Sequence, residues 1–161
     1  MYRLGHYGAA LAVYAPLGFA LLTAGRPTFA VLGGGVSLAL ASLPDIDVRL
    51  PAVDHRGVTH TLGFAVAVGT GLAAVGWVAG ADAGLGSAAE LAVFGFTVGT
   101  LTIVSHLLAD AITPMGITPF WPVSSRHYTL DVCRADNTAA NYALLGLGVA
   151  LSIGVLAAAP N

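Results

Sequence analysis

Five long apolar stretches restrict the folds that this chain can adopt. They cover about residues 7–24, 28–44, 61–80, 88–111 and 139–159. A helix needs roughly 20 mainly apolar residues to cross the hydrocarbon core of a bilayer. Only 9% of the 161 residues are charged, against about 25% in soluble domains, and a soluble chain this short has too small a core to bury so much apolar surface. The sequence therefore predicts an integral membrane protein.

The apolar stretches lack the alternation of a membrane β-barrel, so we predict an all-α, polytopic bundle with about five transmembrane helices. The stretch 28–44 is the weakest, because it is short and rich in glycine. We expect the whole chain, 1–161, to form a single membrane-embedded domain. We also expect Thr59 to cap the third span and the segment 136–138 to cap the last one.

Other features of the composition narrow the class further. The N-terminus shows no signal-peptidase pattern, so we expect the first stretch to be kept as a span. The single cysteine, Cys133, excludes an intramolecular disulfide. The net charge of −2 gives no reason to expect a nucleic-acid partner.

Five crossings bring most ionisable groups to one side of the membrane. The N-terminus, the segment 45–60, the end of the fourth span and the segment 112–138 share this side, as do all five histidines. It also holds five of the six basic residues, which are Arg3, Arg49, Arg56, Arg126 and Arg134. The positive-inside rule makes this side cytoplasmic. We therefore expect a multi-pass protein of the plasma membrane.

Histidines and aspartates recur at the span ends on this side. His106 and Asp110 are four residues apart, so they share one face of a helix. Imidazole and carboxylate ligands suit zinc or a similar divalent ion, and ionisable groups at membrane depth are functional candidates. We predict a site for one or two divalent ions, with zinc favoured by this donor set and with the ligands His6, Asp45, His60, His106 and Asp110.

Each predicted ligand also has an interpretation without a metal. His6 and His60 fit wetted residues at the membrane interface, and Asp45 fits a turn residue at a helix end. The spacing of His106 and Asp110 also occurs in plain hydrogen-bonded pairs.

The rest of the segment 45–60 offers further alternatives. Asp47 fits a general base, a ligand of a second metal ion, or a salt bridge with Arg49. Asp54 and His55 fit further ligands or a solvated turn.

The segment 112–138 contains three prolines and a tryptophan, which favours a fixed interfacial loop. Trp121 and Tyr128 fit interfacial anchors. Arg126 and Arg134 either bind a phosphate, which guanidinium groups suit, or contact lipid headgroups and fix the topology.

Taken together, these motifs resemble a known family. PDID (44–47), HRGVTHT (55–61), SHLLADAITPMGI (105–117) and FWPVSSRHY (120–128), in this order, resemble the pattern of the YdjM-like family of membrane-bound metal-dependent hydrolases. An early histidine in that family corresponds to His6. The departure is Thr61, where serine is commoner. The resemblance covers nearly the whole chain and implies a metal more strongly than it implies a substrate.

A remoter likeness concerns the order of the ligands. His6, Asp45, His60, His106 and Asp110 are similar to the first part of the ligand set of zinc-dependent phospholipases C and the related single-strand nucleases, which cleave phosphoesters. This likeness implies one complete site at the last four residues and a second site at His6 that shares Asp110. The chain lacks the later ligands of those enzymes and starts with methionine instead of tryptophan, so one or two ions are expected rather than three.

The predicted function is hydrolysis by a metal-activated water. A phospholipid, a lipid-linked phosphate or a small phosphoester is the expected substrate, and membrane lipid is the expected partner. Asp47 is a candidate general base, and Arg56 or Arg126 would neutralise the charge that develops on the phosphoryl group. The alternative is a non-catalytic membrane module that uses the metal for structure or partner docking. A transporter would place its ionisable groups near the midplane, whereas here they gather at one face.

Overall fold

The computed structural model describes residues 1–49 and 55–159, and the secondary-structure elements within them are all helices. The long helices are α1 (Arg3–Thr23), α2 (Pro27–Leu40), α3 (Leu62–Gly80), α4 (Leu85–Ala111) and α5 (Thr138–Ala158). The short 3₁₀ helices are η1 (Pro44–Arg49), η2 (Val58–His60) and η3 (Ala81–Ala83). In this described part, five helical segments are long and apolar enough to cross a membrane when α2 is counted through η1. The prediction of an all-α bundle with about five spans is confirmed.

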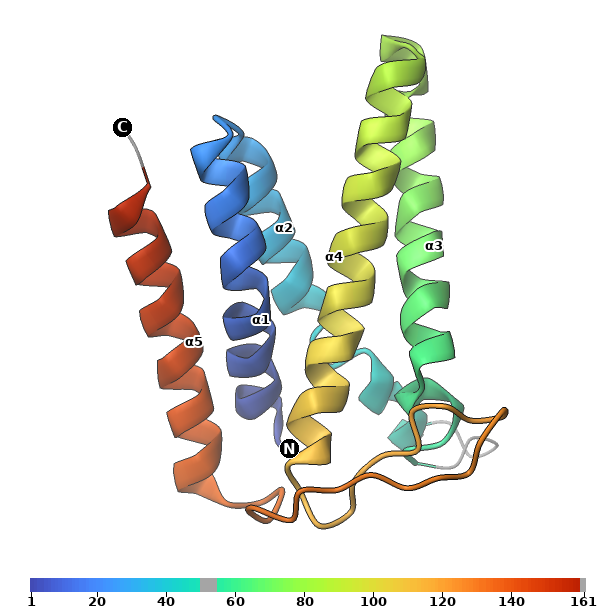
Figure 1. Ribbon diagram of the computed structural model, residues 1–161, viewed down its shortest axis with the longest axis vertical. Helices are drawn as coiled ribbons and strands as arrows, with labels where there is room; N and C mark the ends of the chain where they lie inside the picture. The colour runs from blue at the N-terminus through green and yellow to red at the C-terminus, as the bar shows by residue number, and fades with distance from the viewer. Residues whose placement is uncertain (50–54, 160–161) are drawn as a thin grey trace.

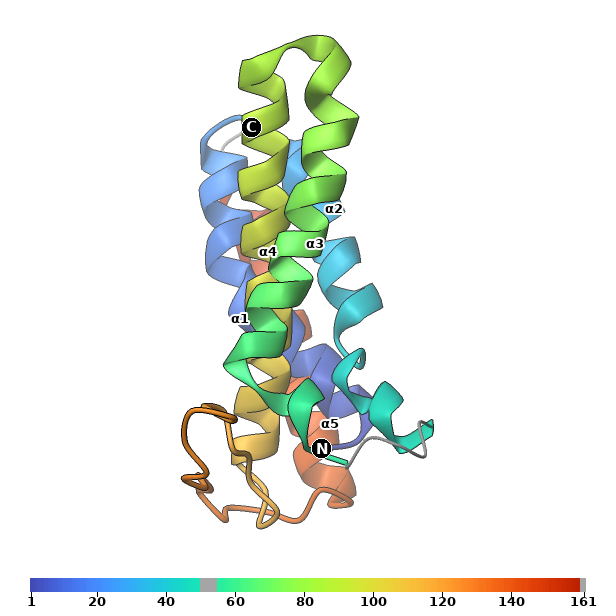
Figure 2. The same cartoon turned by 90° about the vertical axis from the view of Figure 1, so that its right-hand side faces the viewer.

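Two helix pairs build the bundle. α3 and α4 form an antiparallel hairpin that reaches beyond the other helices, and α5 packs along α1 (Figure 1). α1 also contacts α2 and α4, so it joins the two pairs. The view from the side shows η1, η2 and the loop after α4 at the same end as the N-terminus (Figure 2).

Glycines allow the paired helices to approach closely. At the α1–α5 crossing, a Cβ atom at Gly8 would overlap the backbone of Leu144, and one at Gly148 would overlap the carbonyl of Gly8. In the α3–α4 hairpin, Gly76 faces the backbone of Leu91 in the same way. Small residues at membrane helix crossings let backbones pack in direct van der Waals contact. The helices therefore associate through close backbone contact at these positions.

α2 ends earlier than the stretch 28–44 suggested. It stops at Leu40, and it does not resume before η1, because Pro44 disfavours a helical conformation for Leu43. Its 14 residues span about 21 Å, less than the roughly 30 Å of a hydrocarbon core. This short helix brings η1, and with it Asp45, back toward the interior of the bundle.

The two predicted helix caps had different outcomes. The prediction for 136–138 is confirmed, because the side chain of Asn137 accepts a hydrogen bond from the first turn of α5. The prediction for α3 was wrong, because the cap is Thr61. Thr59 lies in η2, and its hydroxyl donates instead to Asp47 at 2.7 Å.

The segment 112–138 folds back under the end of the bundle. An antiparallel bridge pairs Ile117 with Tyr128, and the N–H of Leu62 donates to the carbonyl of Pro119 at 2.8 Å. This loop therefore closes the end of the molecule at which α3 begins and α4 finishes.

The ionisable groups divide between the ends of the bundle as the five crossings predicted. The start of α1, η1, η2 and the segment 112–138 share one end (Figures 1 and 2). At the opposite end, Arg26 before α2 forms an ion pair with Glu90 near the start of α4.

Candidate metal centre

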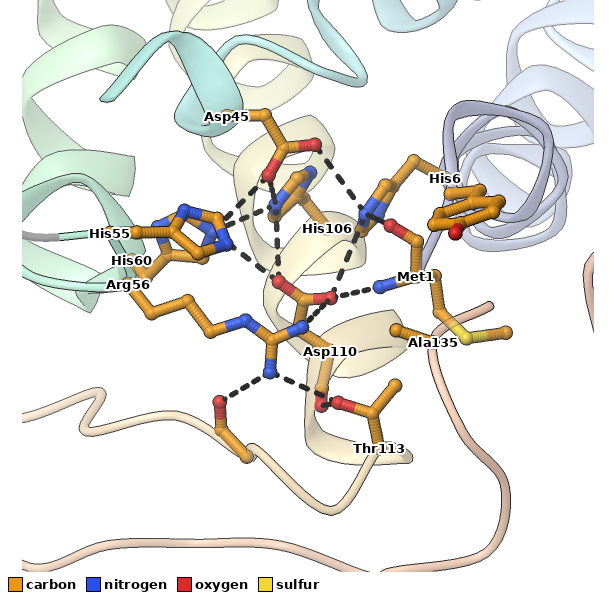
Figure 3. Close-up of polar contacts among 12 residues, drawn as sticks. Met1, His6, Asp45, His55, Arg56, His60, His106, Asp110, Thr113 and Ala135 are labelled. Carbon is orange, nitrogen blue, oxygen red and sulfur yellow. Dashed lines mark hydrogen bonds and ion pairs between the residues drawn. The ribbon is translucent and has the colours of Figure 1, made fainter. Parts of the chain in front are cut away.

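The five residues predicted to bind a metal come from four elements and meet at one end of the bundle (Figure 3). α1 supplies His6, η1 supplies Asp45, η2 supplies His60, and the last turns of α4 supply His106 and Asp110. Donor atoms of His6, Asp45, His106 and Asp110 all lie within 4.8 Å of one another, and His60 and Asp45 belong to an adjoining group.

Four of these side chains direct donor atoms toward one another. The Nε2 atoms of His60 and His106 are 3.1 Å apart. Oδ2 of Asp110 lies 3.3 and 3.4 Å from these two nitrogens, and Oδ1 of Asp45 lies 3.6 and 3.5 Å from them. Ligands of a tetrahedral zinc ion, with bonds of about 2.0–2.1 Å, are about 3.3 Å from each other. The five separations therefore match the spacing of ligands around one small cation.

Both histidines are held through their other ring nitrogen. Nδ1 of His106 is 2.8 Å from the carbonyl oxygen of Ala41. A carbonyl only accepts hydrogen bonds, so Nδ1 carries the proton and, in the neutral ring, the lone pair of Nε2 faces the cluster. Nδ1 of His60 is 3.0 Å from the hydroxyl oxygen of Thr59 and 3.2 Å from Oδ2 of Asp47. Carbonyl and carboxylate partners of this kind orient metal-binding histidines and fix their tautomer.

Asp47 is buried and both of its carboxylate oxygens are engaged. Oδ2 accepts hydrogen bonds from the hydroxyl of Thr59 at 2.7 Å and from the backbone N–H of Arg56 at 3.0 Å. Oδ1 is 2.9 Å from Nδ1 of His55, whose side chain is half-exposed. Asp47 therefore acts on the cluster through His60.

Arg56 supports the opposite carboxylate. Its backbone is in the left-handed region, with φ of 62°, which costs a residue with a side chain roughly 1–2 kcal/mol. Its guanidinium donates to Oδ1 of Asp110 at 2.9 Å, to Oγ1 of Thr113 at 3.0 Å and to the carbonyl of Gly116 at 2.9 Å. Arg56 thus fixes one oxygen of Asp110 and ties the segment 112–138 to the site.

His6 lies on the far face of His106. The two rings stack with centroids 3.7 Å apart and planes at 7°. Nε2 of His6 is 3.0 Å from the carbonyl oxygen of Met1, 3.6 Å from Oδ1 of Asp110 and 3.7 Å from Oδ2 of Asp45. The amino group of Met1 also donates to Oδ1 of Asp110. Asp45 and Asp110 therefore each direct one carboxylate oxygen toward the Nε2 atoms of His60 and His106. The other oxygen of each carboxylate points toward His6.

Most of the cluster is buried, and it is rich in lone pairs. His6, His60 and His106 are 0% exposed and Asp110 is 1% exposed. Oδ2 of Asp110 has no hydrogen-bond partner within the described residues, and an unsatisfied buried acceptor is costly. The lone pairs of facing carboxylates and neutral imidazoles repel one another unless a proton or a metal cation lies between them, and this donor set suits zinc-like divalent ions. The residues present therefore fit a metal ion.

Protons compete with a metal for this cluster. Burial lowers the pKa of His60, but its contacts with Asp110 and Asp45 outweigh burial and raise this pKa above its usual value. Metal binding here therefore displaces a proton.

Other predicted residues lie away from the cluster. Arg126 is exposed, and its guanidinium lies 5.3 Å from the centroid of a tyrosine ring. Arg134, which is 80% exposed, pairs with Asp136. Arg49 forms no ion pair in the described parts of the chain, so the predicted alternative of a salt bridge to Arg49 is not seen there. Asp54 lies outside the described residues.

Sequence reasoning missed three groups that support the site. Thr59 precedes His60 and Thr113 follows Asp110 by three residues, so their polar character beside predicted ligands was an available signal. The carbonyl of Ala41 has no signal in the sequence.

The fold and the site define a class: a polytopic helical membrane protein with a buried histidine–aspartate cluster at one end of its bundle. The model of the YdjM inner membrane protein family matches residues 1–160. The chain therefore belongs to the YdjM inner membrane protein family, as its motifs indicated. No curated protein and no solved structure matches it. The remoter likeness to phospholipases C still rests on the order of the ligands alone.

Proposed function

We propose that this protein is a membrane-embedded metal-dependent hydrolase that cleaves a phosphoester at the cytoplasmic face of the membrane. The observation that supports this proposal most is the buried gathering of donor atoms from Asp45, His60, His106 and Asp110. A divalent ion held there, zinc by the chemistry of the donors, supplies Lewis acidity: it polarises a phosphoryl oxygen and lowers the pKa of water toward 7. Nε2 of His6 faces the carbonyl oxygen of Met1, so a second ion that shares Asp110 would have to displace this contact before His6 could bind it.

The chain's own residues supply the positioning. Ala41 and Asp47 hold the rings of His106 and His60 with Nε2 toward the centre. Arg56 holds Asp110. These partners fix the positions of the donor atoms before a ligand binds, so the site is preorganised. Preorganisation speeds a reaction because the groups already have the geometry that the reaction needs.

Arg56 and Asp47 were both predicted to be catalytic, and their surroundings suggest different roles. Nε of Arg56 has no hydrogen-bond partner within the described residues, and Arg56 lines a cavity that reaches Asp45. In our proposal this N–H donates to the phosphoryl oxygen on which negative charge develops. Both oxygens of Asp47 are already engaged, so we assign it a positioning role through His60. The exposed Arg126 would attract anionic headgroups to the surface.

A combined assay of metal content and turnover tests the proposal. Purified protein in nanodiscs is analysed for metal per chain by mass spectrometry and for phosphate or alcohol release from a panel of phospholipids, lipid phosphates and soluble phosphoesters. We expect about one or two zinc ions per chain and turnover that His106→Ala abolishes. His127→Ala, which removes an exposed histidine at the same end, is the matched control. Stoichiometric metal together with turnover that survives His106→Ala contradicts the proposed chemistry.

A structural role for the metal is the second candidate function, and one observation favours it. The cluster joins α1, η1, η2 and α4, so an ion there would cross-link segments that are distant in sequence. This candidate predicts that chelation lowers the melting temperature or releases a partner, while no ester in the panel is hydrolysed.

A further inference from the structure

Asp45 is the point at which the cluster meets the surface. Its side chain is 28% exposed, whereas those of His6, His60 and His106 are 0% exposed and that of Asp110 is 1% exposed. Among these five residues, Asp45 is therefore the one that an incoming molecule reaches first.

Two cavities open on either side of Asp45. One, of about 300 Å³, lies between the first turns of α1 and the end of α2 with η1, and its wall includes Arg3, Tyr7, Ser42 and Arg49. The other, of about 580 Å³, includes Arg3 and Arg56. Asp45 and Arg3 line both cavities, so each cavity gives access to the exposed carboxylate.

The polar part of the first cavity suits an anion. Arg3 donates to the hydroxyl of Tyr7 at 2.9 Å, and neither Arg3 nor Arg49 pairs with a carboxylate in the described parts of the chain. The hydroxyl of Ser42 is buried and has no hydrogen-bond partner there either. Guanidinium groups bind phosphate oxygens in pairs of charge-assisted hydrogen bonds. The wall thus offers two cations and one hydroxyl beside the candidate metal ligand Asp45.

The remaining part of this cavity is apolar. Ala39, Leu43 and Ile46 line it, and Ile46 is 47% exposed in η1, near the end of the candidate span Pro27–Arg49. The exposed side chains of Leu38 and Val48 continue this surface on either side. A ligand that satisfies both parts carries a phosphate and a hydrocarbon chain.

We propose that the first cavity, a cleft beside Asp45 between the start of α1 and the end of α2, is a lateral entrance for a lipid phosphate. The phosphate is bound by Arg3 and Arg49 beside Asp45, while the hydrocarbon chain lies over Ala39 and Ile46 and remains in the bilayer. The hydrolysis of the bound lipid rests on the proposed function. The inference adds the substrate class of the candidate metal site, which is a membrane-resident phosphoester instead of a water-soluble one.

Binding and turnover measured side by side test the entrance. Dioleoyl phosphatidic acid and the soluble glycerol 3-phosphate, which share a phosphate monoester, are titrated against the full chain in zwitterionic detergent micelles. We expect phosphatidic acid to bind and glycerol phosphate to bind at least about tenfold more weakly. The double substitution Arg3→Gln and Arg49→Gln should weaken lipid binding about tenfold or more, as the loss of charge-assisted hydrogen bonds implies, with unchanged zinc content. Arg134→Gln, at the same end, should not change it.

A second variant tests the apolar part without touching a charge. Ala39→Phe fills the cleft and should weaken lipid binding while zinc content stays the same. Lipid binding that is unchanged in both variants overturns the proposal, and equal affinity for glycerol phosphate overturns its lipid part. If the lipid binds through the arginines but is not hydrolysed, the entrance stands and the proposed hydrolase activity fails.

Discussion

Replacing Asp47 by Asn separates a positioning role from a chemical one. The carboxylate accepts hydrogen bonds from Thr59 and from the backbone of Arg56, and it lies 3.2 Å from Nδ1 of His60. Asparagine keeps the shape but presents one oxygen and one N–H₂ group. The amide is uncharged, so the Nδ1 proton of His60 loses its anionic neighbour, and the tautomer that leaves the lone pair on Nε2, the nitrogen that faces the cluster, becomes less favoured.

The size of the effect follows from this contact. Loss of the carboxylate partner of a metal-binding histidine typically lowers metal affinity about 10- to 100-fold, which corresponds to about 1.4–2.7 kcal/mol. We therefore expect Asp47→Asn to raise the dissociation constant for zinc by that factor. At saturating zinc, turnover should recover to within about tenfold of the unsubstituted protein. The measurement is a competition titration against a chromophoric chelator in detergent, followed by turnover at several zinc concentrations.

A different pattern would refute this reasoning. A general base contributes about 10²–10⁴-fold to a rate, so Asp47→Asn would leave zinc affinity unchanged and abolish turnover at every zinc concentration if Asp47 were the base. Asp131→Asn, which changes an exposed aspartate in the segment 112–138 at the same end of the bundle, controls for the loss of one negative charge. A zinc dissociation constant within twofold of the unsubstituted protein excludes the positioning role.

Three further predictions concern pH, packing and topology. The raised pKa of His60 stabilises the metal-free protein below the usual histidine pKa, and this contribution is lost as pH rises through the raised value. The melting temperature of the metal-free protein should therefore fall over this pH range, while that of the zinc-loaded protein should not. A difference between the two melting temperatures that stays constant with pH contradicts the assignment. Gly8→Val should destabilise the α1–α5 pair by about 1–3 kcal/mol, because the new side chain meets the backbone of Leu144. Gly35→Val on α2 is the control, since a Cβ atom at this exposed position meets nothing. Equal melting temperatures for the two variants would contradict the prediction. In inner-membrane vesicles, with Cys133→Ser as the background, an impermeant thiol reagent should label Ser125→Cys from the cytoplasmic side and Ala83→Cys from the other. Labelling of both from one side would contradict the five crossings.

The helices were accessible from the sequence because long apolar stretches leave few alternatives. The end of the stretch 28–44 was placed too far along, since hydropathy does not register that the helix stops at Leu40 and the chain turns into η1 at Pro44. Thr59 and Thr61 look equally suitable as caps, and the choice of Thr61 depends on the η2 turn, which places the hydroxyl of Thr59 on Asp47. Local conformation therefore decided what periodicity left open.

The cluster was accessible because five crossings bring the span ends to one side, whatever the details of packing. The contacts that support the cluster could not be predicted from the sequence, since each depends on where the folded chain places its two partners. The left-handed backbone of Arg56 sends its guanidinium to Asp110, although the spacing gave no sign of it. Arg3 and Arg49 line the cleft at Asp45, whereas the sequence favoured Arg126, whose guanidinium instead lies over Tyr128.

The closest helix crossings of the bundle are made by glycines and not by the cluster, and this bears on what the cluster is for. The α1–α5 pair meets at Gly8 and the α3–α4 pair at Gly76, where backbones pack directly against each other. Replacing buried ionised groups by well-packed apolar side chains is often neutral or stabilising. Three fully buried histidines beside Asp110 therefore add cost to the fold unless a cation compensates them. A cation bound there offsets that cost, and the partial exposure of Asp45 keeps it within reach of a ligand from the bilayer.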